Sequence, residues 1–177
     1  INSAKNTLGK TTKVIYLSPQ GKKFSASLAK KTADWGKIIL VCGRYEGIDE
    51  RLLATDIDEQ WSIGDFVLTG GELPAMAIID AASRMIPGVL GNDDGADQDS
   101  FSQGLLEHPQ YTRPEIIDGH AVPAVLLSGD HGAIARWRAE QALKKTWLNR
   151  PDLIESLELS KAQREILEHL GNNEDKS

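Results

Sequence analysis

Short apolar runs and amphipathic segments alternate at the start of the chain. The runs at 13–19 (KVIYLSP) and 37–43 (KIILVCG) are rich in β-branched residues and are closed by Pro or Gly, as buried parallel strands are. Between them, from 24 to 35, large apolar residues and a threonine recur at helical spacing. The pattern predicts a strand, helix, strand unit.

Two more short strands are predicted at 56–63 (DIDEQWSI) and 65–70 (DFVLTG). A helix is predicted at 72–86, with Pro74 near its first turn, where the missing N–H costs nothing. This helix is apolar nearly all round. We therefore expect most of its sides to be buried, in the core or against a second subunit.

The segment 91–100 (GNDDGADQDS) contains four aspartates, two glycines and a single apolar residue. Its composition is typical of a linker. We therefore predict an α/β domain over 1–91, a linker over 92–99 and a helical domain over 100–177.

Three helices are predicted in the second domain. Asp130 is placed to cap the first, and Pro151 begins the second. Ser160 and Gln163 form a capping box for the third, which we expect Gly171 to end. At the other end of the chain, residues 1–10 are typical of a helix that Gly9 stops, and we expect a further segment before Ile1.

Composition narrows the class of protein. The formal net charge of -6 argues against nucleic-acid binding through a globally positive surface, but it allows local basic patches. The single cysteine, Cys42, rules out an internal disulfide and suits a reducing cytoplasm, and we expect it to be buried and inert. The sequence contains no apolar run of about eighteen residues, so we expect no contact with a membrane.

Several familiar chemistries lack their motifs. The sequence contains no G-x-G-x-x-G after the first strands, no P-loop and no G-x-S-x-G. The four histidines have no metal-ligand spacing, so no metal site is predicted.

Glycine-rich loops follow the predicted strands, with the sequences SPQG, CGRYEG and SIGDFVLTGGELP. Ligands of open α/β folds bind beyond the carboxyl ends of strands, and glycines there let the backbone approach a ligand closely. Tyr16, Leu17, Tyr45, Ile63 and Leu68 could wall a flat heterocycle. By spacing alone, tight turns explain these loops equally well.

Longer motifs carry a resemblance to a known family. KVIYLSPQG, ILVCGRYEGIDER, WSIGDFVLTGGELPAM, IPGVLG, DSFSQGLLEHPQYTRPE, VPAVLLSGDH and RWRAEQALKKTWLNRPDL together resemble the bacterial tRNA (guanine-37-N1)-methyltransferases. That family belongs to the SPOUT class, whose α/β fold holds S-adenosylmethionine in a deep trefoil knot. The resemblance implies that the two acidic, glycine-flanked loops are walls of this knot.

The resemblance also assigns residues to the cofactor pocket. They are Tyr16, Leu17, Ser18, Pro19, Gly43, Tyr45, Glu46, Ile63, Gly64, Phe66, Leu68, Gly70, Gly71 and Pro74. Phe66 stands where the family commonly has Tyr. The chain departs further at His108, which replaces a small residue, and at Gln110, which replaces a histidine.

Asp99 corresponds to the family's general base and Arg84 to its guanine-binding arginine. The chemistry agrees, because guanine N1 carries a proton and needs a base, while O6 needs a donor as charge develops. Taken by themselves, Asp99 also suits a linker carboxylate or a helix N-cap, and Arg84 suits the end of a helix.

Positive charge is concentrated in the second domain. Residues 128–150 contain five basic and two acidic residues, whereas 151–177 contain three basic and seven acidic ones. We expect tRNA to contact Arg136, Arg138, Lys144, Lys145 and Arg150, although a solvated helix face would look the same.

The resemblance further implies a homodimer with a shared active site and Mg²⁺ as a possible activator. Two alternatives stay open. One is a SPOUT methyltransferase with another RNA target, and the other is a catalytically incomplete fragment that binds S-adenosylmethionine and dimerises.

Overall fold

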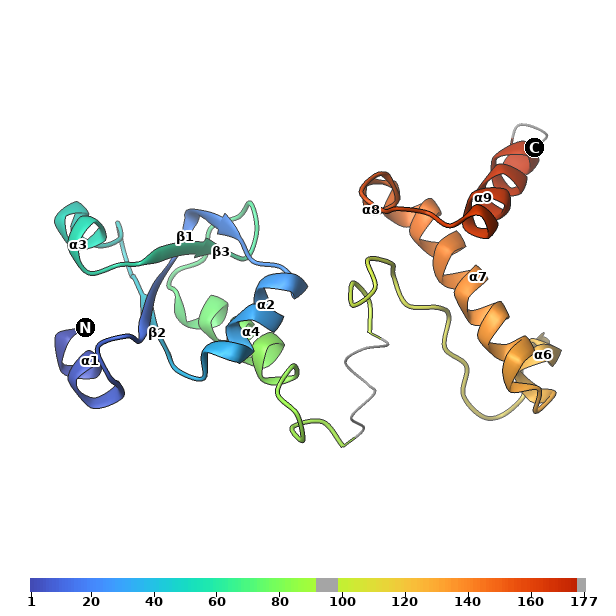
Figure 1. Ribbon diagram of the computed structural model, residues 1–177, viewed down its shortest axis with the longest axis horizontal. Coiled ribbons are helices and arrows are strands. Elements are labelled where there is room, and N and C mark those ends of the chain that lie inside the picture. Colours follow the sequence, from blue (N-terminus) through green and yellow to red (C-terminus); the bar gives the residue numbers. More distant parts are fainter. Residues whose placement is uncertain (92–98, 175–177) are drawn as a thin grey trace. The chain divides into compact units, whose positions relative to one another are not determined.

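The computed structural model describes residues 1–91 and 99–174, which belong to two compact units, Ile1–Ala96 and Asp97–Ser177. Most of the predicted linker, residues 92–98, lies outside the described residues. The first unit contains a parallel sheet with helices, and the second is mainly helical (Figure 1).

The first unit is built on three parallel strands in the order β2-β1-β3. Its elements in chain order are α1 (Asn2–Leu8), β1 (Lys13–Lys23), α2 (Ala26–Trp35), β2 (Ile38–Cys42), α3 (Glu50–Thr55), β3 (Glu59–Ser62) and α4 (Glu72–Ser83). The predicted strand, helix, strand unit is confirmed as β1, α2 and β2. The predicted helix end at Gly9 is also confirmed, since Gly9 follows α1 and donates its N–H to Lys5 O.

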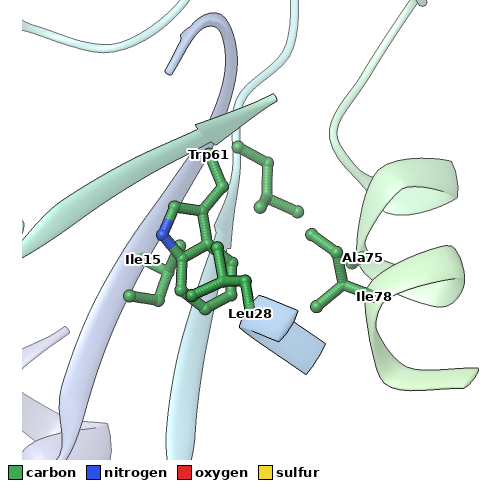
Figure 2. Packing of buried hydrophobic residues seen from close by; sticks show 6 residues of the cluster. Ile15, Leu28, Trp61, Ala75 and Ile78 are labelled. Atoms are coloured by element: carbon green, nitrogen blue, oxygen red, sulfur yellow. The ribbon is translucent and has the colours of Figure 1, made fainter. Parts of the chain in front are cut away.

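The core lies where α2 and α4 pack against one face of the sheet (Figure 2). Ile15, Leu28, Trp61, Ala75 and Ile78 form its centre, together with Leu17. The Trp61 ring is 1% exposed and lies 5.5 Å from the Phe24 ring and 5.9 Å from the Trp35 ring, measured between centroids. Burying these rings supplies much of the hydrophobic stabilisation of a small sheet.

Strand β1 is longer than predicted because it pairs with β3 in two registers. Leu17 lies opposite Trp61, and after an irregular stretch Lys22 lies opposite the same residue. Pro19 in this stretch has no N–H to donate. Gly21 passes so close to β3 that a Cβ there would lie 2.4 Å from Gln60 C. The SPQG stretch is therefore pushed out of the ladder.

The predicted strand at 65–70 is wrong. Residues 65–69 form no strand, Phe66 and Val67 are 52% and 83% exposed, and only Gly70 forms an isolated bridge, with Arg44. The apolar residues favour a strand locally, but a strand needs a neighbour to pair with.

Helix α4 is shorter and less buried than predicted. It ends at Ser83, and only one face, with Ala75, Ile78 and Ala82, is buried within the chain. On the other side Leu73, Met76 and Ile79 are exposed.

The second unit is centred on α7 (His131–Asn149), which packs against α6 (Ala124–Leu127), α8 (Pro151–Glu155) and α9 (Lys161–Glu174). Leu143 and Thr146 of α7 are buried. A small hairpin, β4 (Ile116–Ile117) and β5 (His120–Ala121), precedes them.

Local signals placed these helix starts correctly. Asp130 Oδ1 accepts the Ala133 N–H at 2.9 Å, and Pro151 is the first residue of α8. The capping box is confirmed, because Ser160 N–H and Gln163 N–H each donate to the other residue's side chain. The predicted end at Gly171 is wrong: α9 continues to Glu174, since a single glycine weakens a helix by only about 1 kcal/mol.

Candidate functional site

A pocket of about 310 Å³ lies beyond the carboxyl ends of β2 and β3 and beside the irregular stretch of β1. Its walls are residues 16–20 of β1, the loops at 43–50 and 63–71, and the start of α4. Parallel strands bring these loops to one edge of the sheet although they are far apart in the sequence. The volume falls at the lower end of the range for small-molecule sites.

All of the residues predicted to bind the cofactor line this pocket. They are Tyr16, Leu17, Ser18, Pro19, Gly43, Tyr45, Glu46, Ile63, Gly64, Phe66, Leu68, Gly70, Gly71 and Pro74. Further lining residues were not predicted, namely Gln20, Arg44, Gly47, Ile48, Glu50, Leu53, Trp61, Ser62, Val67 and Thr69. Most of these are neighbours of predicted residues in the same loops, which is the signal that could have found them.

The loops after β2 and β3 are joined by their backbones. The Gly71 N–H donates to Gly43 O at 3.0 Å, and Arg44 forms an antiparallel bridge with Gly70. A Cβ on Gly71 would lie 2.7 Å from Cys42 Cα, so only glycine fits here without movement. This contact places the CGRYEG and LTGGELP loops against each other.

An ion pair links the same two loops through side chains. Arg44 Nε donates to Glu72 Oε1 at 2.8 Å. The pKa of the Glu72 carboxyl is lowered, first by a hydrogen bond from its own backbone N–H at the start of α4 and then by Arg44. Glu72 therefore remains charged, and paired with Arg44, at neutral pH.

Tyr45 occupies an unusual position at the tip of the loop after β2. Its φ is 55°, and its side chain is 99% exposed. A non-glycine residue in the left-handed region is uncommon and is found more often at functional sites. The backbone thus holds an aromatic ring at the mouth of the pocket.

Cys42 differs from its prediction in one respect. It is exposed, because it ends the edge strand β2. The pKa of its thiol is nevertheless raised, by partial desolvation and by the negative charge of Glu72. A raised thiol pKa lowers the fraction of thiolate at neutral pH.

Arg84 and Asp99 belong to different units. Arg84 is half-buried and follows α4, where its backbone N–H donates to Asp80 O at 3.2 Å. Asp99 is half-buried at the start of a series of turns, and its carbonyl oxygen accepts the Ser102 hydroxyl at 2.7 Å. No helix follows Asp99 directly, so it is not a helix N-cap.

The turns after Asp99 are anchored to α7. The Leu106 N–H donates to Thr146 Oγ1 at 2.9 Å, and the Glu107 N–H donates to Ser100 Oγ at 3.0 Å. Nearby, His108 is half-buried with Nδ1 3.1 Å from Pro109 O, and Gln110 donates to Glu107. These bonds fix the segment that carries Asp99 within its own unit.

The predicted tRNA-binding cations have different surroundings. Arg136 and Arg138 line a second pocket, whereas Lys144 and Lys145 are exposed further along α7. Arg150 makes two hydrogen bonds to Asp152, at 2.8 and 2.7 Å, and lies over the Phe101 ring. Its charge is therefore largely matched by Asp152.

Within residues 1–91 and 99–174, no group of His, Cys, Asp and Glu has the arrangement of a metal site, so the suggested Mg²⁺ has no ligand set there. No helix in this part of the chain is long and apolar enough to cross a membrane.

Comparison with known proteins places these features in a family. A family model described as tRNA (Guanine-1)-methyltransferase TrmD matches residues 1–156. A tRNA (guanine-N(1)-)-methyltransferase of Pasteurella multocida is 58% identical over 170 residues, which are 96% of this chain and 69% of the relative. A protein of the same description from Proteus mirabilis is 60% identical over 167 residues, 94% of this chain and 67% of the relative.

Proposed function

Because the chain belongs to the tRNA (guanine-1)-methyltransferase family, we propose that it transfers a methyl group from S-adenosylmethionine to N1 of guanosine 37 in tRNA. One observation supports this best: all the residues that the family resemblance assigns to the cofactor line a single pocket. The named relatives favour guanine N1 over another RNA target.

The pocket is chemically suited to S-adenosylmethionine. Ile63, Leu68 and Pro74 offer apolar surface to a heterocycle, and the glycines offer backbone groups. The Glu46 carboxylate lines the same pocket and can balance a cationic ligand. When bound, S-adenosylmethionine supplies an electrophilic methyl group on a sulfonium. We also propose that the two loops joined by the Gly71–Gly43 hydrogen bond belong to the trefoil knot of the SPOUT class.

In this proposal Asp99 removes the proton from N1 of guanine, and Arg84 stabilises the negative charge that develops on O6. Asp99 would accept the N1 proton, which leaves on N1 the electron pair that forms the new N–C bond, while the bond from the methyl group to sulfur breaks and its electron pair stays on the sulfur, which leaves as a neutral thioether. Arg84 donates to O6, where negative charge develops. No other groups of this chain need to change protonation state.

We further propose a homodimer in which one subunit supplies the pocket and the other supplies Asp99. The exposed face of α4 supports this assembly, since Leu73, Met76 and Ile79 are 60%, 65% and 55% exposed. These residues recur every three positions, so they form one apolar stripe. Exposed apolar residues on one face of a helix are typical of an interaction site.

For tRNA, we propose that Arg136, Arg138, Lys144 and Lys145 of α7 contact phosphates, with a smaller role for Arg150. Because its substrate would be cellular tRNA, we propose a cytoplasmic location.

The test is Asp99→Asn, which keeps the size of the side chain and removes the proton acceptor. Methylation of a tRNA with G37 is expected to fall at least about a hundredfold, while calorimetry gives an unchanged S-adenosylmethionine affinity. Asp34→Asn, at an exposed position of α2, is the matched control.

Nuclease digestion and mass spectrometry of the product tRNA then locate the methyl group. Retention of a third of the wild-type rate would remove Asp99 from the role of base. A methyl group on ribose would refute the proposed reaction.

A further inference from the structure

A cation–aromatic contact lies close to Asp99 within the helical unit. The guanidinium of Arg150 lies over the ring of Phe101, with 5.9 Å between Cζ and the ring centroid. Phe101 is two residues after Asp99, whereas Arg150 lies between α7 and α8. The contact therefore joins the junction of two helices to the turn that carries the proposed base, and the proposed reaction assigns it no role.

Arg150 is held firmly on its own side of this contact. Its Nε and Nη2 donate to the two carboxylate oxygens of Asp152, at 2.8 and 2.7 Å. Its backbone N–H donates to Thr146 O at 2.7 Å, and its carbonyl accepts the Leu153 N–H at 3.0 Å. A bidentate pair fixes the plane of a guanidinium as well as its position. Asp152 therefore orients the face that Arg150 presents to Phe101.

Phe101 has an unusual backbone on the other side of the contact. Its φ is 74°, in the left-handed region, which is uncommon for residues other than glycine. Its N–H donates to Leu105 O at 2.7 Å, and its carbonyl accepts the Gly104 N–H at 3.2 Å. The ring is 44% exposed, so burial alone does not hold it. Such a conformation persists only where neighbouring groups restrain it, and it is found more often near functional sites.

The backbone of Phe101 is linked directly to that of Asp99. Asp99 O accepts both the Ser102 N–H, at 3.2 Å, and the Ser102 hydroxyl, at 2.7 Å. Asp99 and Ser102 thus close a turn that contains Phe101. A change in the backbone of Phe101 would therefore move Asp99.

Two other contacts join this turn segment to the rest of the unit. The Leu106 N–H donates to Thr146 Oγ1 at 2.9 Å. A Cβ on Gly104 would lie 2.5 Å from Leu157 Cδ2, so the segment packs against the residues that follow α8. Of these three contacts, the one between Arg150 and Phe101 lies nearest to Asp99 along the chain.

From these contacts, and resting on the proposed function, we propose that Arg150 is a positioning residue, which acts on the Asp99 carboxylate through the ring of Phe101. Misplacing a reacting group by about 1 Å can lower a rate about a hundredfold. An interaction that places the base for the chemical step lowers the rate of that step when it is removed, and leaves the binding of tRNA unchanged.

The experiment compares two replacements of Arg150. Arg150→Met removes the charge, whereas Arg150→Lys keeps a charge for phosphates but loses the planar fork that pairs with Asp152. Single-turnover methylation of a tRNA with G37 gives the rate of the chemical step, and tRNA binding at several salt concentrations gives the affinity and its salt slope. Arg164→Met, at an exposed position of α9, is the matched control.

Both Arg150 variants are expected to lower the single-turnover rate about tenfold and to keep the tRNA affinity and salt slope of wild type. A contact with phosphate predicts the opposite pattern. Arg150→Met would then reduce the salt slope by roughly 0.7–0.9 and weaken binding, whereas Arg150→Lys would retain most of the activity.

A double-mutant cycle tests whether Arg150 acts through Phe101. Phe101→Tyr keeps the ring and is expected to keep the wild-type rate, whereas Phe101→Leu removes the ring and is expected to match Arg150→Met. The variant with both Arg150→Met and Phe101→Leu is expected to be no slower than either single variant, because both changes remove the same contact.

A wild-type single-turnover rate in Arg150→Met and Arg150→Lys would overturn the proposal, as would losses that simply multiply in the double variant. Circular dichroism checks folding, and Arg150→Lys decides the outcome if Arg150→Met does not fold. If wild type does not methylate a tRNA with G37, or if Asp99→Asn remains active, the proposed function fails instead, so the two failures are distinguishable.

Discussion

Gly71→Ala tests the backbone contact that brings the two pocket loops together. The new Cβ would lie 2.7 Å from Cys42 Cα, 3.0 Å from Cys42 Cβ and 3.3 Å from Gly43 N. The nearest of these is a backbone atom, so no side chain can rotate away to make room. Gly71 has φ -79° and ψ -4°, which alanine also adopts, so the effect is steric rather than conformational.

The size of the effect follows from two opposing terms. Overpacking of this kind lowers the free energy of unfolding by about 1–3 kcal/mol. Replacing glycine by alanine raises it by about 0.4–1 kcal/mol, because the unfolded chain then has fewer conformations. With mid-range values of about 2 and about 0.7 kcal/mol, the expected net loss of stability is roughly 1.3 kcal/mol, or a fall in Tm of about 3–5 °C for a chain of this size. Separating the loops should also lower the S-adenosylmethionine affinity about tenfold.

Thermal unfolding followed by circular dichroism gives the Tm, and calorimetry well below that Tm gives the cofactor affinity of folded protein. Gly91→Ala is the matched control, because its added Cβ meets nothing within 4 Å and its φ lies outside the left-handed region. A Gly71→Ala variant with wild-type Tm and wild-type affinity would refute the close contact between Gly71 and Cys42.

Two further changes test the helical unit and the apolar stripe of α4. Thr146→Val keeps the shape of a fully buried side chain but leaves the Leu106 N–H without its acceptor. Urea denaturation should therefore show a free energy of unfolding that is about 1–3 kcal/mol lower than that of wild type. The control Thr55→Val, at an exposed position, should show little change. Met76→Glu places a charge on the apolar stripe of α4 and should convert a dimer to a monomer, which light scattering measures. The control Lys30→Glu, on the exposed surface of α2, should leave the dimer intact. A Met76→Glu protein that is still a dimer would show that α4 is not part of the interface.

The sequence by itself determined the features that depend on near neighbours. The hydrophobic pattern placed β1, α2 and β2, and single side chains placed the helix starts at Asp130, Pro151 and Ser160. These signals act within about four residues, so they need no knowledge of the rest of the fold. The Asp118–Gly119 turn of the hairpin carries a similar local signal, although no hairpin was predicted there.

Many of the residues that line the pocket beyond β2 and β3 could be named through the family resemblance, but their convergence is a property of the tertiary structure. Gly43 and Gly71 are far apart in the chain, and only the parallel sheet brings their backbones to 3.0 Å. Tertiary structure likewise left 65–69 without a strand partner, exposed Cys42 at the sheet edge and gave α4 one buried and one exposed face. Each of these outcomes depends on which distant segment lies alongside, and local propensities of a few tenths of a kcal/mol do not determine that pairing.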